Sequence, residues 1–309
     1  MLPFLLRRLL QALPTLFAVT VVVFLVLELT GDPVALMLGD DATDEAIARV
    51  RTELGLDDPI HVRYLRYLVG AVQGDFGHSP RFNMAVSQLF VERIPATLEL
   101  AAAALVVSLV IGLVAGVFAA VHHGSAFDHV ARFLALLGQA VPNFFLGIVA
   151  IIVFGAQLGW LPTGGRGTAA HLVLPALTLG TYYAALTMRF VRGAMLDVLN
   201  ADYVRTARSK GLPPFTVVVK HAFRNAAIGV VTLIGLQMGS LLGGAVVTET
   251  VFSWPGVGRM AIQAIYARDF PLVQITILAM AATFVFVNVL ADVVYSLVDP
   301  RIRLDGDRR

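Results

Sequence analysis

The 309-residue sequence contains no cysteine and only two lysines, Lys210 and Lys220. Without cysteine, a disulfide-stabilised secreted domain and a cysteine-ligated metal protein are excluded. Neither lysine follows a glycine, so the Gly-x-x-x-x-Gly-Lys-[Ser/Thr] loop that holds nucleotide phosphates is absent. Only 14% of residues are charged and 58% are hydrophobic, which is too apolar for a soluble or disordered chain. The net charge of +2 is too small to imply a nucleic-acid partner.

What the chain has instead is a series of long runs without a charged residue. Six of them are long enough to cross the roughly 30 Å hydrocarbon core of a bilayer, which needs about 20 helical residues. We therefore expect an all-α polytopic membrane protein in which residues 1–309 form one transmembrane domain. The predicted spans lie at about residues 9–29, 100–122, 133–159, 169–190, 226–248 and 272–294.

The first run follows Arg7 and Arg8, as the hydrophobic core of a signal peptide would. Its exit, Glu28–Pro33, contains no small-x-small cleavage site. We therefore expect this run to be retained as the first span.

Basic residues between the spans predict the orientation of the chain. Residues 189–224 carry seven basic and two acidic residues, and connections of this kind stay in the cytoplasm. With six spans, the N- and C-termini then lie in the cytoplasm too, and residues 30–97 form an external segment. Within that segment we expect a short helix at residues 44–54, closed by Gly55, and a second helix that Pro59 starts, which runs through residue 72 and ends near Gly74.

Polar residues are sparse inside the predicted spans. Gln139, Asn143, Tyr183 and Gln237 are the candidates for lining a substrate path, because buried polar groups in a membrane tend to face a bundle interior or water. Hydrogen bonding between helices is the alternative role for the same side chains. Pro142 is expected to bend the third span, because it removes a backbone hydrogen bond.

Glycines at four-residue spacing mark the second and fifth spans, where they allow helices to approach closely. They lie at Gly112 and Gly116, and at Gly235, Gly239 and Gly243. Packing within this chain and a seam to a partner chain are both compatible with the pattern.

The connection between the fourth and fifth spans carries the most information. Asp202–Lys210 has helical character, Gly211 stops the helix, and Pro213 and Pro214 prevent its continuation. A second helix from Phe215 to about residue 225 leads into the fifth span. Such a helix–glycine–helix elbow can insert into a groove on another protein, although a basic membrane-anchoring loop has a similar composition.

This connection resembles the EAA loop of permease subunits in ATP-binding-cassette (ABC) importers. Only Ala207 and Gly211 match the general motif literally, whereas Asp202–Leu212 and Lys220–Ala226 are similar to the form found in the peptide-importer branch. Further stretches similar to this branch extend over nearly the whole chain. They include Gly31-Asp32-Pro33, Gly74-Asp75-Phe76-Gly77, Pro95–Leu100, Leu174–Gly180, Glu249-x-x-Phe252-Ser253-Trp254-Pro255-Gly256, Arg268-Asp269-Phe270-Pro271 and Asp299–Arg303.

The resemblance implies the type I ABC importer permease fold and a B-type subunit of the dipeptide/oligopeptide/nickel/glutathione group, in the bacterial plasma (inner) membrane. It implies pairing with a homologous second permease, two cytoplasmic ATPase subunits that use ATP and Mg²⁺, and an extracytoplasmic binding protein. The cargo would be a dipeptide, an oligopeptide or a related small solute such as glutathione, moved by alternating access. This chain would bind no cofactor, metal or nucleic acid and would not be an enzyme.

The resemblance also assigns roles to particular residues. In the coupling loop, residues 191–224, those expected to contact the ATPase are Asp202, Tyr203, Arg205, Thr206, Ala207, Arg208, Lys210 and Gly211. Phe252, Trp254 and Pro255, in a lid-like external turn, are candidates for a gate or a contact with the binding protein. The path lined by the four polar residues would be shared with the second permease.

Two rival classes need no ATPase. A secondary transporter or channel often carries ionisable groups in mid-span, and a membrane-embedded hydrolase needs a catalytic pair at one depth. Here no such pair is visible in the sequence. The charges closest to the spans sit at their ends: Glu28, Glu99, Arg189 and Asp292. The histidines at 122, 123 and 129 fit a polar cytoplasmic turn better than a metal site.

Overall fold

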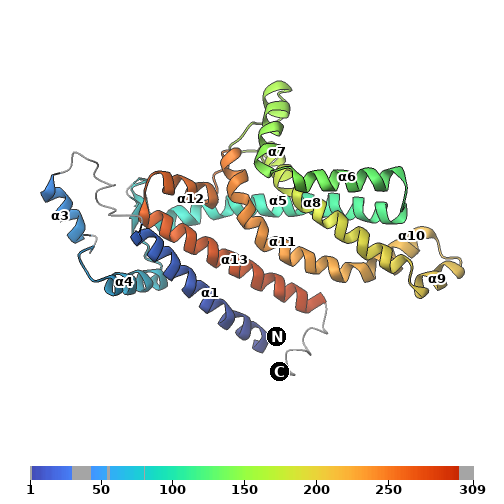
Figure 1. Cartoon of the computed structure of the whole chain (residues 1–309), viewed down its shortest axis with the longest axis horizontal. Coiled ribbons are helices and arrows are strands. Elements are labelled where there is room, and N and C mark those ends of the chain that lie inside the picture. Colours follow the sequence, from blue (N-terminus) through green and yellow to red (C-terminus); the bar gives the residue numbers. More distant parts are fainter. Residues whose placement is uncertain (1, 30–42, 54–55, 80, 299–309) are drawn as a thin grey trace.

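The computed structural model describes residues 2–29, 43–53, 56–79 and 81–298, most of them in helices. Figure 1 shows an elongated bundle with α9 and α10 at one end and α3, α4 and α12 at the other. We call these the α9 end and the α12 end. The motifs at Gly31-Asp32-Pro33 and Asp299–Arg303, and the predicted helix stop at Gly55, lie outside the described residues.

Five helices are long and apolar enough to cross a membrane unbroken. They are α1 (Leu2–Leu29), α5 (Val86–Val121), α8 (Ala169–Leu199), α11 (Arg224–Val251) and α13 (Phe270–Val298). A bent pair, α6 (Ala126–Ala140) followed by α7 (Asn143–Ala150) and the π-helical stretch η1 (Ile151–Gln157), passes the same test only when its parts are taken together, as a broken sixth span or a re-entrant loop. Five of the six predicted spans thus overlap an unbroken helix, and the third overlaps this bent pair.

All five of these helices are longer than the predicted spans, and α5 and α8 exceed them most. α5 begins at Val86 although its apolar run begins at Leu100, and it continues through Pro95. α8 runs to Leu199, so the first nine residues of the predicted coupling loop are helical. A charged residue indicates where a helix leaves the hydrocarbon of the membrane. The helix itself ends only where its backbone hydrogen bonds are interrupted.

The third crossing is bent at Pro142, as expected. α6 ends at Ala140, Val141 and Pro142 take extended backbone angles, and α7 starts at Asn143. The two segments meet at 102°. In Figure 1 α6 lies along the bundle, whereas α7 stands out from it.

The centre of the bundle is the pair α5 and α8, whose backbones approach closely at glycines. A Cβ on Gly112 would lie 2.5 Å from Thr187 Cβ, and one on Gly116 would lie 2.8 Å from the Met188 carbonyl. A Cβ on Gly239 of α11 would lie 2.9 Å from Phe284 of α13. Packing within this chain is therefore the role of these three glycines, while Gly243 has open space beside it.

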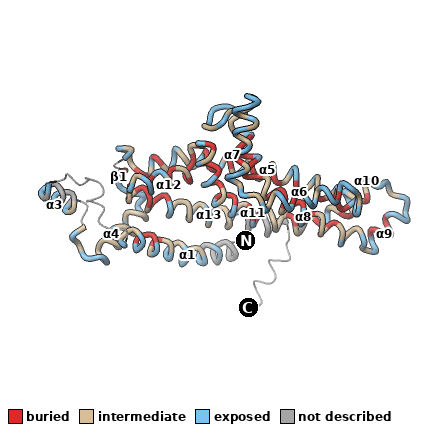
Figure 2. The backbone as a smooth tube through the Cα atoms, turned by 45° about the horizontal axis from the view of Figure 1, so that its top comes forward, coloured by how far each residue is buried: buried red, intermediate tan, exposed pale blue. Residues whose placement is uncertain are grey.

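The outer surfaces of the bundle are strongly apolar. Figure 2 shows buried backbone along α5, α8, α11 and α12, with exposed residues on the faces turned away from them. Exposed apolar side chains include Leu13 and Phe17 on α1 and Phe133 on α6. Faces of this kind suit a hydrocarbon environment or another apolar subunit.

The α12 end carries the short elements of the chain. They are α3 (Asp44–Glu53), which stands apart from the bundle in Figure 1, and α4 (Ile60–Gln73), strands β1 (His78–Ser79) and β2 (Met84–Ala85), and α12 (Val257–Tyr266), which lie near the tips of the long helices. α4 starts after Pro59 and ends at Gly74, which takes a left-handed φ of 73°. Both boundaries match the sequence prediction, whereas the antiparallel strand pair was not foreseen.

Candidate functional site

The elbow predicted around Gly211 is present at the α9 end. α9 (Asp202–Ser209) is followed by Gly211, whose φ of 74° is left-handed and whose N–H donates to the Arg208 carbonyl at 2.9 Å. Pro213 then turns the chain into α10 (Pro214–Thr216), which continues through the π-helical stretch η2 (Val217–Phe223) into α11. The predicted second helix therefore exists and is continuous with the fifth span.

α9 has one buried and one exposed face. Val204 and Ala207 are buried, and they pack with Val217 of η2 and with Leu199 at the end of α8. This small core fixes α9 to the helices on either side of it, so that α9, the end of α8 and the start of α11 form one packed unit. Of the eight proposed coupling residues, Ala207 therefore faces the chain's own core.

The other seven proposed coupling residues are exposed. Asp202 and Arg205 approach to 3.5 Å, but both side chains are largely in water, so this pair contributes little to stability. The ring of Tyr203 is exposed beside them, and so is Phe215 just after the elbow. The outer face of α9 thus offers aromatic, basic and acidic groups to another molecule.

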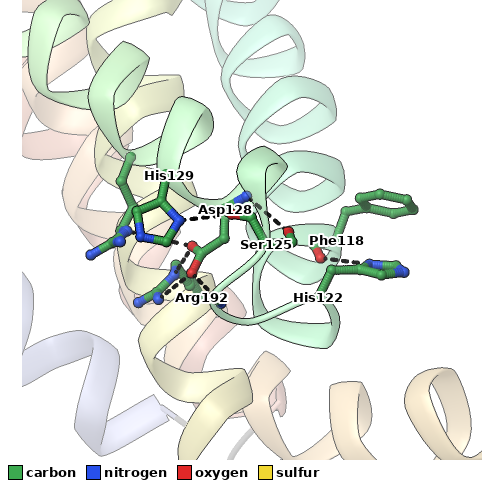
Figure 3. A network of polar contacts seen from close by, with 8 residues as sticks. Phe118, His122, Ser125, Asp128, His129 and Arg192 are labelled. Carbon is green, nitrogen blue, oxygen red and sulfur yellow. Dashed lines mark hydrogen bonds and ion pairs between the residues drawn. The ribbon is translucent and has the colours of Figure 1, made fainter.

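A buried ion pair, which the sequence prediction missed, ties α6 to α8 near the elbow (Figure 3). Asp128 is completely buried, and it accepts two hydrogen bonds from Arg192, at 2.6 and 2.9 Å. It also accepts one from Gly124 N–H at 3.0 Å, and its own N–H donates to the Ser125 side chain that caps α6. Arg132 lies 3.5 Å away on the next turn.

The side chains of His122 and His129 are placed to bond backbone carbonyls and not the Asp128 carboxylate. His122 Nδ1 lies 3.1 Å from the Phe118 carbonyl, and His129 Nδ1 lies 2.8 Å from the Ser125 carbonyl. In Figure 3 His122 lies beside the ring of Phe118, away from Asp128. Among the described residues, no group of three potential ligands could hold a metal ion.

The four predicted path residues fall into two groups. Gln237 is buried between α5, α8 and α11, where its Nε2 donates to Thr187 at 2.9 Å and to the Tyr183 carbonyl at 3.4 Å. Its Oε1 accepts from Ser108 at 3.2 Å. Gln237 thus lies in a closed network of hydrogen bonds between helices, which was the alternative role considered for it, and Tyr183 contributes only its backbone carbonyl to this network.

Gln139 and Asn143 lie elsewhere, on the two sides of the bend at Pro142. Gln139 Oε1 accepts a hydrogen bond from Arg189 of α8, while its Nε2 is buried and has no partner among the residues that the structure describes. Asn143 is the first residue of α7 and is partly exposed. These two residues are therefore next to the most irregular backbone in the bundle.

The predicted lid at the α12 end is tightly packed. Phe252 and Trp254 are buried, and the Trp254 indole N–H donates to the Ala96 carbonyl at 2.7 Å. Gly165 N–H donates to the Phe252 carbonyl at 2.8 Å, which ties the turn to the loop after η1. Pro255 is half-buried between the two helices.

A buried carboxylate holds this lid, and the sequence alone did not assign it a role. Glu249 is fully buried near the end of α11, where it accepts a hydrogen bond from Thr97 of α5 at 2.6 Å. It also accepts one from Arg259 N–H in the first turn of α12, at 2.9 Å. The positive end of that helix and the threonine hydroxyl stabilise the carboxylate.

A polar pocket of about 300 Å³ lies at the same end, beside α4. It is lined in part by Arg63, which pairs with Glu28 at 2.7 Å, and by Tyr67. Burial, with a smaller contribution from Tyr64, raises the pKa of Tyr67 to about 12. Its hydroxyl is buried without a hydrogen-bond partner in the described part of the chain.

Comparison with known families accounts for nearly the whole chain. Residues 112–304 match the family described as "Binding-protein-dependent transport system inner membrane component", and residues 1–101 match the N-terminal part of such membrane components. The chain belongs to this family. It is thus a multi-pass permease subunit of an ABC importer, as the resemblance implied.

Individual relatives agree. The permease is 43% identical to proteins named "Glutathione transport system permease protein GsiC" from Escherichia coli K12, Salmonella typhi and Salmonella paratyphi A. The alignments cover 98% of this permease and 99% of each relative. The elbow, the lid and the bundle between them are therefore all within the shared region.

The fold is also similar to a chain of the methionine ABC transporter MetNI in an inward-facing conformation. The TM-score is 0.57 at 21% identity, and the match covers 69% of this permease and 97% of that chain. This similarity supports the type I importer fold.

The residues that sequence reasoning missed are the buried charges. Asp128 and Arg192 carried a usable signal, because each is a charge within a few residues of an apolar run. Glu249 stood in a motif already noted for its aromatic residues. What the sequence does not contain is the pairing, since Asp128 and Arg192 are 64 residues apart.

Proposed function

We propose that this permease is one of two homologous membrane subunits through which an ATP-driven importer moves glutathione or a short peptide into the bacterial cell. The observation that carries the proposal is the exposed outer face of α9, held by a buried inner face to both α8 and α11. A displacement applied to α9 would move two membrane helices together. The 43% identity to permeases named for glutathione supports the class of cargo.

In the proposed assembly, α9 docks into a cleft of a cytoplasmic ATPase subunit, and ATP and Mg²⁺ are bound there. The exposed coupling residues are Asp202, Tyr203, Arg205, Thr206, Arg208, Lys210 and Gly211, while Ala207 fixes α9 from beneath. The α9 end then faces the cytoplasm with both termini. The α12 end, with Phe252, Trp254 and Pro255, faces the binding protein.

We further propose that the path runs beside the bend at Pro142, where Gln139 and Asn143 are partly accessible. Tyr183 and Gln237 would join it only in a state in which the hydrogen bonds to Ser108 and Thr187 are open. Because the parent has no cysteine, single cysteines at these positions can be probed with a small polar thiol reagent. Position 143 should react in the resting state, and position 237 should react only in a nucleotide-dependent state.

The direct test is uptake by vesicles that contain this permease, the second permease, both ATPases and the binding protein. Radiolabelled glutathione should accumulate only with ATP, and an excess of unlabelled dipeptide reports how far the cargo class extends. Uptake that persists when the ATPases are omitted would favour a secondary transporter. If the binding protein delivers neither glutathione nor peptides, the cargo assignment is wrong.

Orientation has its own test. Tags at residue 1, near Lys210 and after Arg309 should report cytoplasm, and tags near Asp58 and Gly258 should report the outside. An external signal at Lys210 would overturn the proposed topology.

A further inference from the structure

An apolar groove runs between α1 and α13 close to the α12 end. Its volume is about 550 Å³, and it is lined by Val22 and Val26 of α1, Ile265 of α12, Val273 and Ile277 of α13, and their apolar neighbours. Both helices begin or end their apolar spans at this level, at Leu29 and Phe270. The groove therefore opens toward the hydrocarbon of the membrane near one of its surfaces.

One charged residue, Arg268, lines the otherwise apolar groove. The side chain is exposed, and no hydrogen bond or ion pair engages its guanidinium within the described residues. The adjacent carboxylate does not compensate it, because Asp269 is buried and accepts hydrogen bonds from the Ser79 hydroxyl and Leu272 N–H. A positive charge without a partner thus lies at the interfacial end of an apolar groove.

The backbone at this position makes an arginine unexpected. Arg268 has a left-handed φ of 55°, and its N–H closes the end of α12 by donating to the Ile265 carbonyl at 3.1 Å. Glycine or asparagine is favoured at such a helix end, because other side chains crowd the backbone there. The guanidinium of Arg268 does not stabilise this turn, so the side chain must serve a contact outside the turn.

An occupant that suits this groove has an apolar body and an anionic head at one end. A free anion would leave the apolar walls uncovered, and a neutral hydrocarbon chain would leave Arg268 unpaired. The bilayer supplies molecules with both parts at this level, since phospholipid phosphates lie where the apolar spans end. Basic pockets between membrane helices on the cytoplasmic side bind anionic headgroups through the same attraction of charges, which acts equally on phosphates at the opposite surface.

We propose that Arg268 and the α1–α13 groove form a binding site for an anionic phospholipid. One acyl chain lies in the groove, and the headgroup phosphate accepts hydrogen bonds from the guanidinium of Arg268. The site depends on the chain lying in a bilayer and not on the identity of the transported solute. Failure of glutathione uptake would therefore leave it standing.

The test is native mass spectrometry of the complete importer, released from nanodiscs that contain equal amounts of phosphatidylglycerol and phosphatidylcholine. We expect the parent to retain phosphatidylglycerol in preference. Arg268→Asn should reduce that retention about five-fold, because one basic group near a membrane surface changes the affinity for anionic lipid by about that factor. Arg268→Lys should keep most of it.

Asparagine is chosen because it suits the left-handed backbone, so the variant removes the guanidinium without straining the turn. The matched control is Arg66→Asn at the same end, an arginine outside the groove that already pairs with Asp58. A third variant, Val26→Trp, fills the groove from an exposed position and should reduce retention of both lipids.

Three results would overturn the proposal. In the first, Arg268→Asn retains as much phosphatidylglycerol as the parent. In the second, the Arg66→Asn control loses as much phosphatidylglycerol as Arg268→Asn does. In the third, the parent shows no preference between the two lipids. A photoreactive residue at position 26 adds an independent readout. Crosslinking to the second permease in place of lipid would show that a protein helix fills the groove.

Discussion

Replacing Asp128 with asparagine should destabilise the permease far more than any surface charge change. Asparagine keeps the shape and one acceptor oxygen, but it leaves Arg192 and Arg132 without their counter-charge. Removing one partner of a buried ion pair costs about 3–5 kcal/mol. The Arg192 side chain retains 15% exposure, so water can solvate part of it, and we expect the lower end, about 3 kcal/mol.

The assay is thermal unfolding of the detergent-purified importer, followed by size-exclusion chromatography with fluorescence detection. A large domain loses about 2 °C in Tm for each kcal/mol, so Asp128→Asn should lower Tm by about 6 °C. The control is Asp58→Asn, which breaks the exposed pair with Arg66 and should cost less than about 1 kcal/mol.

A double-mutant cycle identifies the cause. Arg192→Met alone should also destabilise, because it leaves Asp128 with only Arg132 and the Gly124 N–H. The double variant should lose less than the two single losses combined, with an interaction energy of about 1–3 kcal/mol. Additive losses, or an Asp128→Asn variant that melts within 1 °C of the parent (well below the about 6 °C expected), would refute the argument.

Three further predictions concern the elbow, the helix seam and the lid. Gly211→Val should strain the left-handed turn by about 1–3 kcal/mol and reduce ATPase co-purification and stimulated ATP hydrolysis, whereas Gly211→Asn should be milder; normal stimulation in the valine variant would remove the elbow from coupling. Gly112→Val should cost about 1–3 kcal/mol in thermal unfolding, because its side chain meets Thr187, whereas Gly193→Ala, with open space around it, should be neutral or stabilising. Trp254→Phe should cost about 2–3 kcal/mol through the lost indole hydrogen bond and the cavity left behind, and an unchanged Tm would contradict its packing role.

The sequence predicted the elements that are set by local chemistry. Apolar run length gave the spans, Pro142 gave the bend, and Pro59 and Gly74 gave the limits of α4. Gly211 gave the elbow, because its left-handed conformation is a property of one residue. Each of these depends on a few consecutive residues.

What the sequence did not predict depends on contacts between distant segments. Gln237 looked like an isolated polar group in a span, yet two neighbouring helices, α5 and α8, supply its partners. Ala207 sits within the proposed contact helix, and only the packing against Val217 shows that it faces inward. Helix length was also underestimated, since α8 continues nine residues beyond the predicted span without a residue that would break it.

The buried pair of α6 and α8 also bears on how the chain is made. Asp128 leaves the ribosome 64 residues before Arg192. At about 5–20 residues per second, the carboxylate waits about 3–13 s for its guanidinium. Until then Asp128 has only Arg132 of its own helix as a nearby cation and lacks the two hydrogen bonds from Arg192, so the final packing of α6 must follow the synthesis of α8. Assembly of this half of the permease is thus ordered by the position of a single acid in the chain.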